Sequence, residues 1–337
     1  MNNHQNAIFH QITNFLKTPL ALLGVDLKNF QFNKICHFAN HPYLCKGLTF
    51  LILCLSSLVF AGVHPSKPWL EINYPQDQEK RWWNDAWWQE GQLPVPQNHQ
   101  VSMQEITYMD GEVKVEAFLF KPTQPGKYLP ILFQHGRRGL DDWTLPRVKR
   151  LAARGFIVLA PNMFGTYLKP PFPNKHTPAY DHHVAKGIDV LLERDDIIGN
   201  KVCTVSHTRG GYMTLKALVT HKQQAEKVAC YVSYYPHWQD PDASEVEQVY
   251  QYASEINDLK VPTLIFIGEH EQYQRLRPIL LGIKVLKTNR IDAELIVYPG
   301  VGRGFDFRPE HVRTFADDLA AKDANQRTAA FVRKHLQ

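Results

Sequence analysis

Short apolar runs alternate with amphipathic segments from about residue 101 to the C-terminus. The apolar runs stand at 130–134 (PILFQ), 155–160 (GFIVLA), 201–205 (KVCTV), 228–233 (VACYVS), 262–267 (PTLIFI) and 293–298 (AELIVY). Segments with apolar residues at helical spacing separate most of them, as in Val184, Ile188 and Leu191. Continuous apolar strands that alternate with helices predict a mostly parallel sheet with helices on both faces. In such an α/β fold, ligands bind at the carboxyl ends of the strands.

A pair of antiparallel strands is expected before the parallel ones. Residues 113–117 (VKVEA) alternate between apolar and polar side chains, and the turn dipeptide DG stands at 110–111. Alternation with a period of two is typical of a half-buried hairpin strand. We therefore expect a single α/β domain at residues 101–337 that opens with a hairpin.

An uncharged apolar run at residues 48–61 (LTFLILCLSSLVFA) has the features of a secretory signal. It follows Lys46 and ends at Ala61, with small residues where a signal peptidase recognises them. Its fourteen residues are short for a transmembrane helix, which needs about 20. We expect an exported protein, periplasmic or secreted, and the alternative is membrane association through an anchor at residues 47–61. Residues 1–46 are either a real N-terminal tail or the result of a start codon placed too early.

The arm at residues 62–100 is rich in Pro and Trp, and the sequence RWWNDAWW at 81–88 holds four of the seven Trp residues. Their spacing suits one face of a short helix. We expect this face to pack against the domain, since Trp side chains bury a large apolar area. The alternative is an exposed aromatic patch on residues 82–88, which would make the chain an interaction protein of the cell surface.

Composition argues against two classes of protein. Lys and Arg number 38 against 33 Asp and Glu, without basic blocks, so we predict no nucleic-acid binding. Of the five cysteines only Cys203 and Cys230 follow the leader, which is too few for a disulfide framework. Both fall in predicted buried strands. We expect two small core side chains there, and the alternative is one bridge in an oxidising compartment.

Residues 203–212 (CTVSHTRGGY) pass from a strand to a helix through a turn of small residues, which is the context of a nucleophile elbow. Other motifs stand in order around it: HG at 135–136, RGFIVLAP at 154–161, GEHE at 268–271, YPGVGRGF at 298–305 and a closing Ala-rich helix. With these motifs the chain resembles the dienelactone hydrolase family, from residue 110 to the C-terminus. The resemblance implies an α/β-hydrolase fold and a hydrolase of carboxylic esters or lactones, and no cofactor is expected.

The resemblance places the nucleophile at Thr208, the acid at Glu271 and the base at Arg303, in the chain order that α/β-hydrolases use. A Glu can replace Asp in the acid role. An arginine has a pKa above about 12 and stays protonated, so Arg303 is not a general base. An elbow residue adopts a positive φ, which costs a β-branched side chain such as Thr208 on the order of 1–3 kcal/mol. These three residues therefore do not match ordinary serine- or cysteine-hydrolase chemistry.

The turn itself admits two structures. Ser206 stands where the elbow pattern has its first glycine, which suggests that the turn departs from its usual geometry. Threonine is also a good N-cap residue, so the alternative role of Thr208 is to cap the helix that follows this strand.

Three histidines are expected near the site: His135 after the third strand, His207 beside the nucleophile and His270 beside the acid. One of them would supply the missing base if it activated the Thr208 hydroxyl or a water. None occupies the family's base position, and each is more typical of a hydrogen-bonded loop residue. The nearby His and Glu residues at 182, 183, 269, 270 and 271 show no recognised ligand spacing, so no metal site is predicted.

Positive charge gathers at the expected strand ends, at Arg137, Arg138, Arg209 and Arg303. The backbone N–H groups of Arg137 and Arg209 are expected to form an oxyanion hole. Together with the helix N-terminus after Arg209, the four arginines predict a receptor for a carboxylate, sulfate or phosphate group of a small molecule. The alternative is that Arg137 and Arg138 are solvated and that Arg303 forms a salt bridge with Glu271.

Two functions follow from these residues. The first is an ester or lactone hydrolase with Thr208 at the nucleophile position, which the resemblance to a family of hydrolases supports. The second is a catalytically silent relative that binds an anionic small molecule through an Arg-rich pocket, which the missing base supports.

Overall fold

The computed structural model describes residues 90–91, 98–224 and 226–337. All of them belong to one compact unit. The predicted tail at 1–46, the signal-like segment at 47–61 and most of the arm at 62–100, with residues 82–88, lie outside the described residues, so those predictions stay predictions. Within the described ranges, no helix is both long and apolar enough to cross a membrane.

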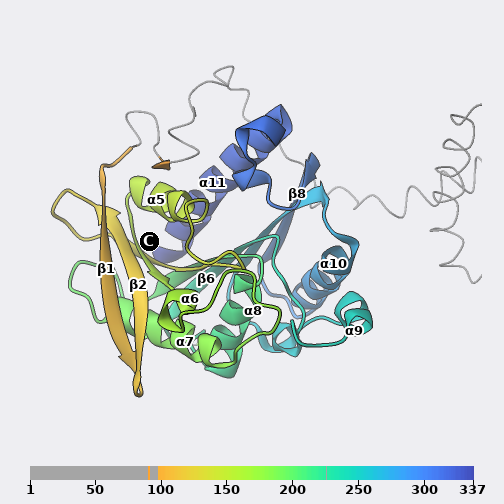
Figure 1. Cartoon of the computed structure of the whole chain (residues 1–337), viewed down its shortest axis with the longest axis horizontal. Helices are drawn as coiled ribbons and strands as arrows, with labels where there is room; N and C mark the ends of the chain where they lie inside the picture. Colours follow the sequence, from red (N-terminus) through yellow and green to blue (C-terminus); the bar gives the residue numbers. More distant parts are fainter. Residues whose placement is uncertain (1–89, 92–97, 225) are drawn as a thin grey trace, which may run out of the picture. The chain divides into compact units, whose positions relative to one another are not determined.

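Eight strands of the described chain form one sheet in the order β1-β2-β4-β3-β5-β6-β7-β8 (Figure 1). The strands are β1 (Val101–Asp110), β2 (Val113–Pro122), β3 (Leu129–Gln134), β4 (Phe156–Pro161), β5 (Val202–His207), β6 (Val228–Tyr234), β7 (Thr263–His270) and β8 (Ala293–Gly302). β1 and β2 form the predicted hairpin, β2 runs antiparallel to β4, and the remaining neighbours pair in parallel. The expected mostly parallel sheet is confirmed.

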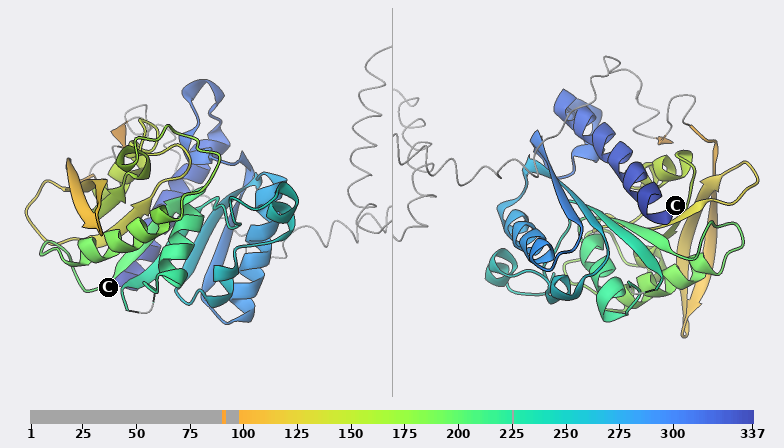
Figure 2. Two further views of the ribbon diagram at one scale, coloured as in Figure 1. Left: turned by 60° about the horizontal axis from the view of Figure 1, so that its bottom comes forward. Right: turned by 180° about the vertical axis from the view of Figure 1, so that it is seen from behind.

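Helices cover both faces of this sheet. The α-helices are α5 (Leu145–Ala153), α6 (Met163–Thr166), α7 (Ala179–Leu192), α8 (Gly210–Leu215), α9 (Glu245–Tyr250), α10 (Tyr273–Thr288) and α11 (Phe315–Leu336). α5 and α11 pack on one face, whereas α7, α8 and α10 pack on the other (Figure 2). A π-helical turn, η4 (Lys216–Thr220), extends α8, and 3-10 turns stand at η5 (Ser254–Asp258), η6 (Phe305–Phe307) and η7 (Glu310–Val312).

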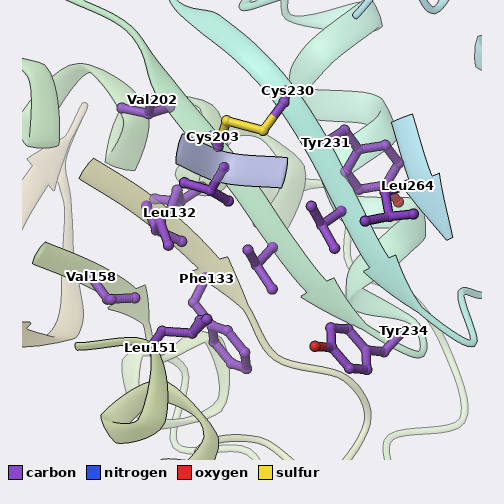
Figure 3. Close-up of a cluster of buried hydrophobic side chains, with 14 of the residues drawn as sticks. Leu132, Phe133, Leu151, Val158, Val202, Cys203, Cys230, Tyr231, Tyr234 and Leu264 are labelled. Carbon is purple, nitrogen blue, oxygen red and sulfur yellow. A yellow bond between two sulfur atoms is a disulfide. The ribbon is translucent and has the colours of Figure 1, made fainter. Parts of the chain in front are cut away.

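The central strands are buried on both sides because helices cover both faces. β3, β4 and β5 are buried along their whole length. This double burial is the reason why their sequences are continuous apolar runs instead of alternating ones. Figure 3 shows part of the core, in which Leu132 and Phe133 of β3 share a cluster with Leu151 of α5. The packed core fixes the carboxyl ends of the strands, where the predicted site residues follow.

Cys203 and Cys230 form a disulfide between β5 and β6 (Figure 3). The two residues lie directly opposite each other in the strand register, with their Cα atoms 4.7 Å apart, and neither is exposed. The expectation of two unpaired core cysteines was wrong. Sequence showed that each lies in a buried strand, but only the pairing of β5 with β6 brings them side by side.

Candidate active site

The turn between β5 and α8 keeps the geometry of a nucleophile elbow. Thr208 stands in it with φ of 51°, in the left-handed region. Its N–H donates to the Tyr234 carbonyl oxygen at 3.1 Å, and its carbonyl oxygen accepts from the His237 N–H at 2.8 Å. These bonds to β6 and the residues after it hold a conformation that costs a β-branched residue on the order of 1–3 kcal/mol.

The two alternatives for this turn are not observed. The N-cap of α8 is Arg209, without a side-chain capping bond, so Thr208 does not cap the helix. Ser206 lies within β5, fully buried, and its Oγ is 2.8 Å from the Oγ of Ser233 on β6. The serine is therefore accommodated by a hydrogen bond across the sheet, and the suggestion that it alters the turn was wrong.

Close backbone contacts place the Thr208 hydroxyl against the loop after β3. A Cβ added to Gly136 would overlap Thr208 Oγ1, and one added to Gly210 would lie 2.5 Å from the Gln134 carbonyl oxygen. Only glycine fits at both positions. The hydroxyl consequently faces the loop whose next residue is Arg137, the residue expected to supply one N–H of the oxyanion hole.

A salt bridge joins the two residues that the resemblance assigns as acid and base. Arg303 Nη1 donates to Glu271 Oε1 at 2.9 Å, and the Gln272 N–H donates to the same oxygen at 2.9 Å. The Glu271 side chain is fully buried and the Arg303 side chain is 18% exposed. The guanidinium also lies 5.3 Å from the centre of the Tyr235 ring. The predicted pairing of Arg303 with Glu271 is confirmed, and it leaves no imidazole at the base position.

His135 has a structural role. Its Nδ1 lies 2.8 Å from the Gly136 carbonyl oxygen, and its Nε2 accepts from the Met163 N–H at 3.2 Å. Both ring nitrogens are therefore engaged, and the ring joins the loop after β3 to α6. Burial lowers the pKa of His135 to about 4, which keeps the imidazole neutral at pH 7.

His207 belongs to a buried cluster beneath the elbow. Its ring stacks on Tyr234 with centroids 4.5 Å apart, and its Nε2 is 3.3 Å from Asp306 Oδ2. Asp306 also accepts from Arg147 Nε at 2.7 Å and from the Tyr235 hydroxyl at 2.5 Å. Burial alone would raise the pKa of Asp306, but the Arg147 charge and the His207 hydrogen bond hold it well below its usual range. This cluster escaped sequence analysis because its members come from four separate segments.

Across the described ranges, none of the three expected histidines hydrogen-bonds to Thr208. His135 and His207 bond elsewhere, and His270 is exposed at the end of β7. His237, which sequence analysis did not select, is buried and its Nε2 accepts from Arg275 Nη1 at 2.6 Å. Burial, followed by the nearby Arg275 charge, lowers the pKa of His237 well below its ordinary value. These rings therefore leave Thr208 without a direct proton acceptor.

Four arginines near the elbow are close enough to affect one another's charge: the predicted Arg137, Arg209 and Arg303, and also Arg275. Burial and then the charge of Arg137 lower the pKa of Arg209 to about 10. Burial and then the charges of Arg303 and Arg209 lower the pKa of Arg275, in the first turn of α10, to about 10. Arg138 pairs with Asp141 at 2.6 Å and lines the small cavity beside Thr208. Arg275 escaped notice because it lies in an ordinary amphipathic helix.

Two of these arginines also hold the segment after α6 in place. Arg209 Nη1 donates to the Pro173 carbonyl oxygen at 2.9 Å, and Arg137 Nη2 donates to the Phe172 carbonyl oxygen at 3.0 Å. The Phe172 N–H in turn donates to the Arg137 carbonyl oxygen at 2.6 Å. Both side chains thus contribute positive charge near the elbow while they position one wall of the site.

A cavity of about 10 Å³ adjoins the Thr208 side chain. Its lining comprises Gly136, Arg138, Thr144, Arg147, His207, Thr208 and Phe307. A volume of this size admits about one water molecule. Larger hollows of about 600 and 660 Å³ lie elsewhere on the described part of the chain, and Thr208 itself is partly exposed.

A parallel-rich sheet in this strand order, with a residue at positive φ between β5 and the following helix, defines an α/β-hydrolase. Residues 115–336 match the model of the dienelactone hydrolase family. The match covers more than half of the chain, and the protein belongs to that family. No curated protein matches the sequence.

Solved structures support the same fold. An esterase from Pyrobaculum calidifontis is 18% identical, with a TM-score of 0.56 over 69% of this chain and 85% of that chain. A thermostable esterase from Pseudomonas putida ECU1011 is 17% identical, with a TM-score of 0.54 over 70% and 84%. The dienelactone hydrolase-like promiscuous phosphotriesterase P91, from metagenomic libraries, is 14% identical, with a TM-score of 0.52 over 70% and 99%. At these identities the likeness establishes the fold.

Proposed function

We propose that the protein hydrolyses a carboxylic ester or lactone, with Thr208 as its nucleophile. The observation that carries this proposal is the φ of 51° at Thr208. Strained backbone of this kind is costly and clusters at active sites, where the surrounding structure maintains it. The family to which the chain belongs supports the same reaction class.

In the proposed reaction, Thr208 Oγ1 attacks the acyl carbon and the ester C–O bond breaks. A water passes the Thr208 hydroxyl proton to the departing alcohol. A second water then hydrolyses the acyl-threonine ester, which releases the acid and restores the Thr208 hydroxyl. The N–H groups of Arg137 and Arg209 stabilise the oxyanion. Arg303 cannot accept the proton, so turnover is slow: a triad enzyme without its base retains roughly 10³–10⁴-fold catalysis over water.

The proposed substrate carries an anionic group. Arg137, Arg209, Arg275 and Arg303 are close enough to perturb one another, and Glu271 pairs with only one of them, Arg303, among the described residues. A carboxylate or phosphate on the substrate would offset the remaining positive charge.

A second candidate function is anion binding without catalysis. The salt bridge between Arg303 and Glu271 favours it, because both residues of the acid–base pair are committed to each other. In this case the positive φ of Thr208 is a remnant of the family's elbow, and the arginines bind a small anionic ligand.

Turnover separates the two functions. The full chain is assayed with p-nitrophenyl acetate and with a p-nitrophenyl ester that bears a free carboxylate, beside Thr208→Ala and Thr208→Ser. Slow turnover that favours the anionic ester and disappears in Thr208→Ala supports the hydrolase. Absence of turnover in every variant, with saturable binding of the carboxylate product, supports the silent relative.

We also propose that the protein is exported, as its signal-like segment at 47–61 suggests. The disulfide between Cys203 and Cys230 supports this location, because such bonds persist in oxidising compartments. Anchoring by residues 47–61 is the alternative, and extraction of the protein from a cell fraction with and without detergent distinguishes the two.

A further inference from the structure

Imidazole and carboxylate groups converge where the β1–β2 hairpin meets the start of α7. Asp110 is the last residue of β1, and His182 and His183 lie in the first turns of α7. The Nδ1 atoms of both histidines are 2.5 Å from the same oxygen, Asp110 Oδ2. All three ligand atoms lie within 4.8 Å of one another. The cluster shares no residue with the site around Thr208.

Hydrogen bonds orient the buried half of this cluster. His183 and Asp110 are almost fully buried. The Tyr108 hydroxyl donates to the His183 carbonyl oxygen at 2.7 Å, and the Tyr167 hydroxyl lies 2.7 Å from His183 Nε2. A metal-bound histidine almost always uses its other ring nitrogen for a hydrogen bond that orients the ring. Tyr167 is placed to serve that purpose while Nδ1 of His183 faces Asp110.

The other half of the cluster is open to solvent. The His182 side chain is 60% exposed, so an ion has access to the two nitrogens and the carboxylate. His221, which follows the π-helical turn η4, stands edge-on to His182 with ring centroids 5.2 Å apart. Its ring is near enough to supply a fourth ligand after a side-chain rotation.

We propose that Asp110, His182 and His183 bind a divalent transition-metal ion of the zinc type, with His221 or a water as the fourth ligand. Two imidazoles and one carboxylate suit zinc, cobalt or nickel, whereas magnesium and calcium prefer oxygen ligands alone. Ligand atoms about 2.0–2.2 Å from a tetrahedral ion lie roughly 3.3 Å apart. Both Nδ1 atoms are 2.5 Å from Asp110 Oδ2, so binding requires this oxygen to move away from both rings. The exposed His182 ring can also shift.

This site departs from the prediction that the chain has no metal site. Sequence motifs for zinc rely on histidines at a helical repeat, such as positions i and i+4. Here two adjacent histidines reach one carboxylate that lies 72 residues away from the first. The bound ion would link the hairpin to α7, and α7 begins just after the segment that Arg137 and Arg209 hold beside the elbow.

The test is calorimetric titration of the metal-free full chain with zinc chloride, followed by the visible absorption of the cobalt-loaded protein. We expect one zinc per chain, and binding at least tenfold weaker in His182→Ala and in Asp110→Asn. Replacing a residue that only hydrogen-bonds to a metal ligand already lowers metal affinity by about 10–100-fold, so loss of a ligand itself should lower it at least tenfold. His311→Ala, which removes another exposed histidine, should bind zinc like wild type.

The melting temperature of the metal-free protein tests whether the variants fold. His182 is exposed, so His182→Ala should melt at the same temperature as wild type. Zinc should raise the melting temperature of wild type and of His311→Ala, but not of His182→Ala. The proposal is overturned if wild type at micromolar concentration binds no zinc when zinc is in about hundredfold molar excess. It is also overturned if His182→Ala and Asp110→Asn bind zinc as tightly as wild type does. The outcome is independent of whether the protein hydrolyses esters.

Discussion

Arg303 and Glu271, which the resemblance assigns to the base and acid positions, are bonded to each other at 2.9 Å. The pair places two opposite charges where the resemblance implies an acid–histidine pair. Because an arginine stays protonated, the pair offers Thr208 no proton acceptor. This relationship explains how an intact elbow and an absent base coexist in one structure.

The pair predicts a large stability effect when only one partner is removed. Arg303→Met leaves the carboxylate of Glu271 buried and without its main partner, which should lower the free energy of unfolding by about 3–5 kcal/mol. Glu271→Gln combined with Arg303→Met removes both charges and should restore stability to within about 1–2 kcal/mol of wild type. Urea unfolding measures both values. Arg138→Met, in the more exposed pair with Asp141, is the control and should cost less than about 1 kcal/mol. Equal losses for the two arginine variants would contradict the argument.

The same pair predicts that a histidine at position 303 restores a base. Arg303→His places an imidazole beside Glu271, which can orient it, and Thr208→Ser provides a better nucleophile for the elbow. The double variant should hydrolyse p-nitrophenyl acetate about 10²–10⁴ times faster than Thr208→Ser alone, the usual contribution of general base catalysis. Arg303→Lys with Thr208→Ser is the matched control, since a protonated amine adds no base. No increase in the His variant would show that the imidazole does not reach the nucleophile.

Much of the fold was accessible from the sequence, whereas the contacts of the site were accessible only in part. The apolar runs at 130–134 and 201–205 become β3 and β5 because strands covered on both faces need no polar alternation. The bond between Glu271 and Arg303 could be expected because two motifs in a known order fix where both residues lie. Arg275, Asp306 and the cluster at Asp110 could not, since their partners lie far away along the chain. Long-range contacts of this kind depend on packing and not on a local pattern.

His135 predicts a loss of stability in mild acid. Its pKa is about 4 in the folded protein and about 6.5 in the unfolded chain, so the unfolded state binds more protons between these values. The free energy of unfolding is therefore unaffected by His135 above about pH 6.5, and it falls as the pH drops from about 6.5 towards 4. Over that window the loss from this residue approaches about 3 kcal/mol. In His135→Gln the dependence of stability on pH should be shallower in the same window, and identical slopes for the two proteins would refute the assignment.

The disulfide predicts that two thiols are absent from the native protein and that their loss is costly. Intact mass should be two hydrogens below the value for free Cys203 and Cys230, and it should rise by two hydrogens after reduction under denaturing conditions. Replacement of both cysteines by alanine should lower the free energy of unfolding by about 3 kcal/mol, because the bond closes a loop across a sequence separation of 27. Peptide mapping without reduction decides the matter, because three further cysteines precede Cys203 in the full chain. Peptides that carry both Cys203 and Cys230 as free thiols would exclude the bond.

The positive φ of Thr208 predicts that a variant without the hydroxyl can gain stability while it loses activity. Glycine adopts a positive φ without steric cost, so Thr208→Gly should relieve strain of about 1–3 kcal/mol, partly offset by about 1 kcal/mol for the greater freedom of glycine in the unfolded chain. Thr208→Val keeps the β-branched shape and its strain but lacks the hydroxyl. We expect Thr208→Gly to be more stable than Thr208→Val by about 1 kcal/mol in urea unfolding, and both to be inactive. If the glycine variant is instead the less stable of the two, the elbow is not strained at this residue, and the observation that carries the proposed hydrolase loses its force.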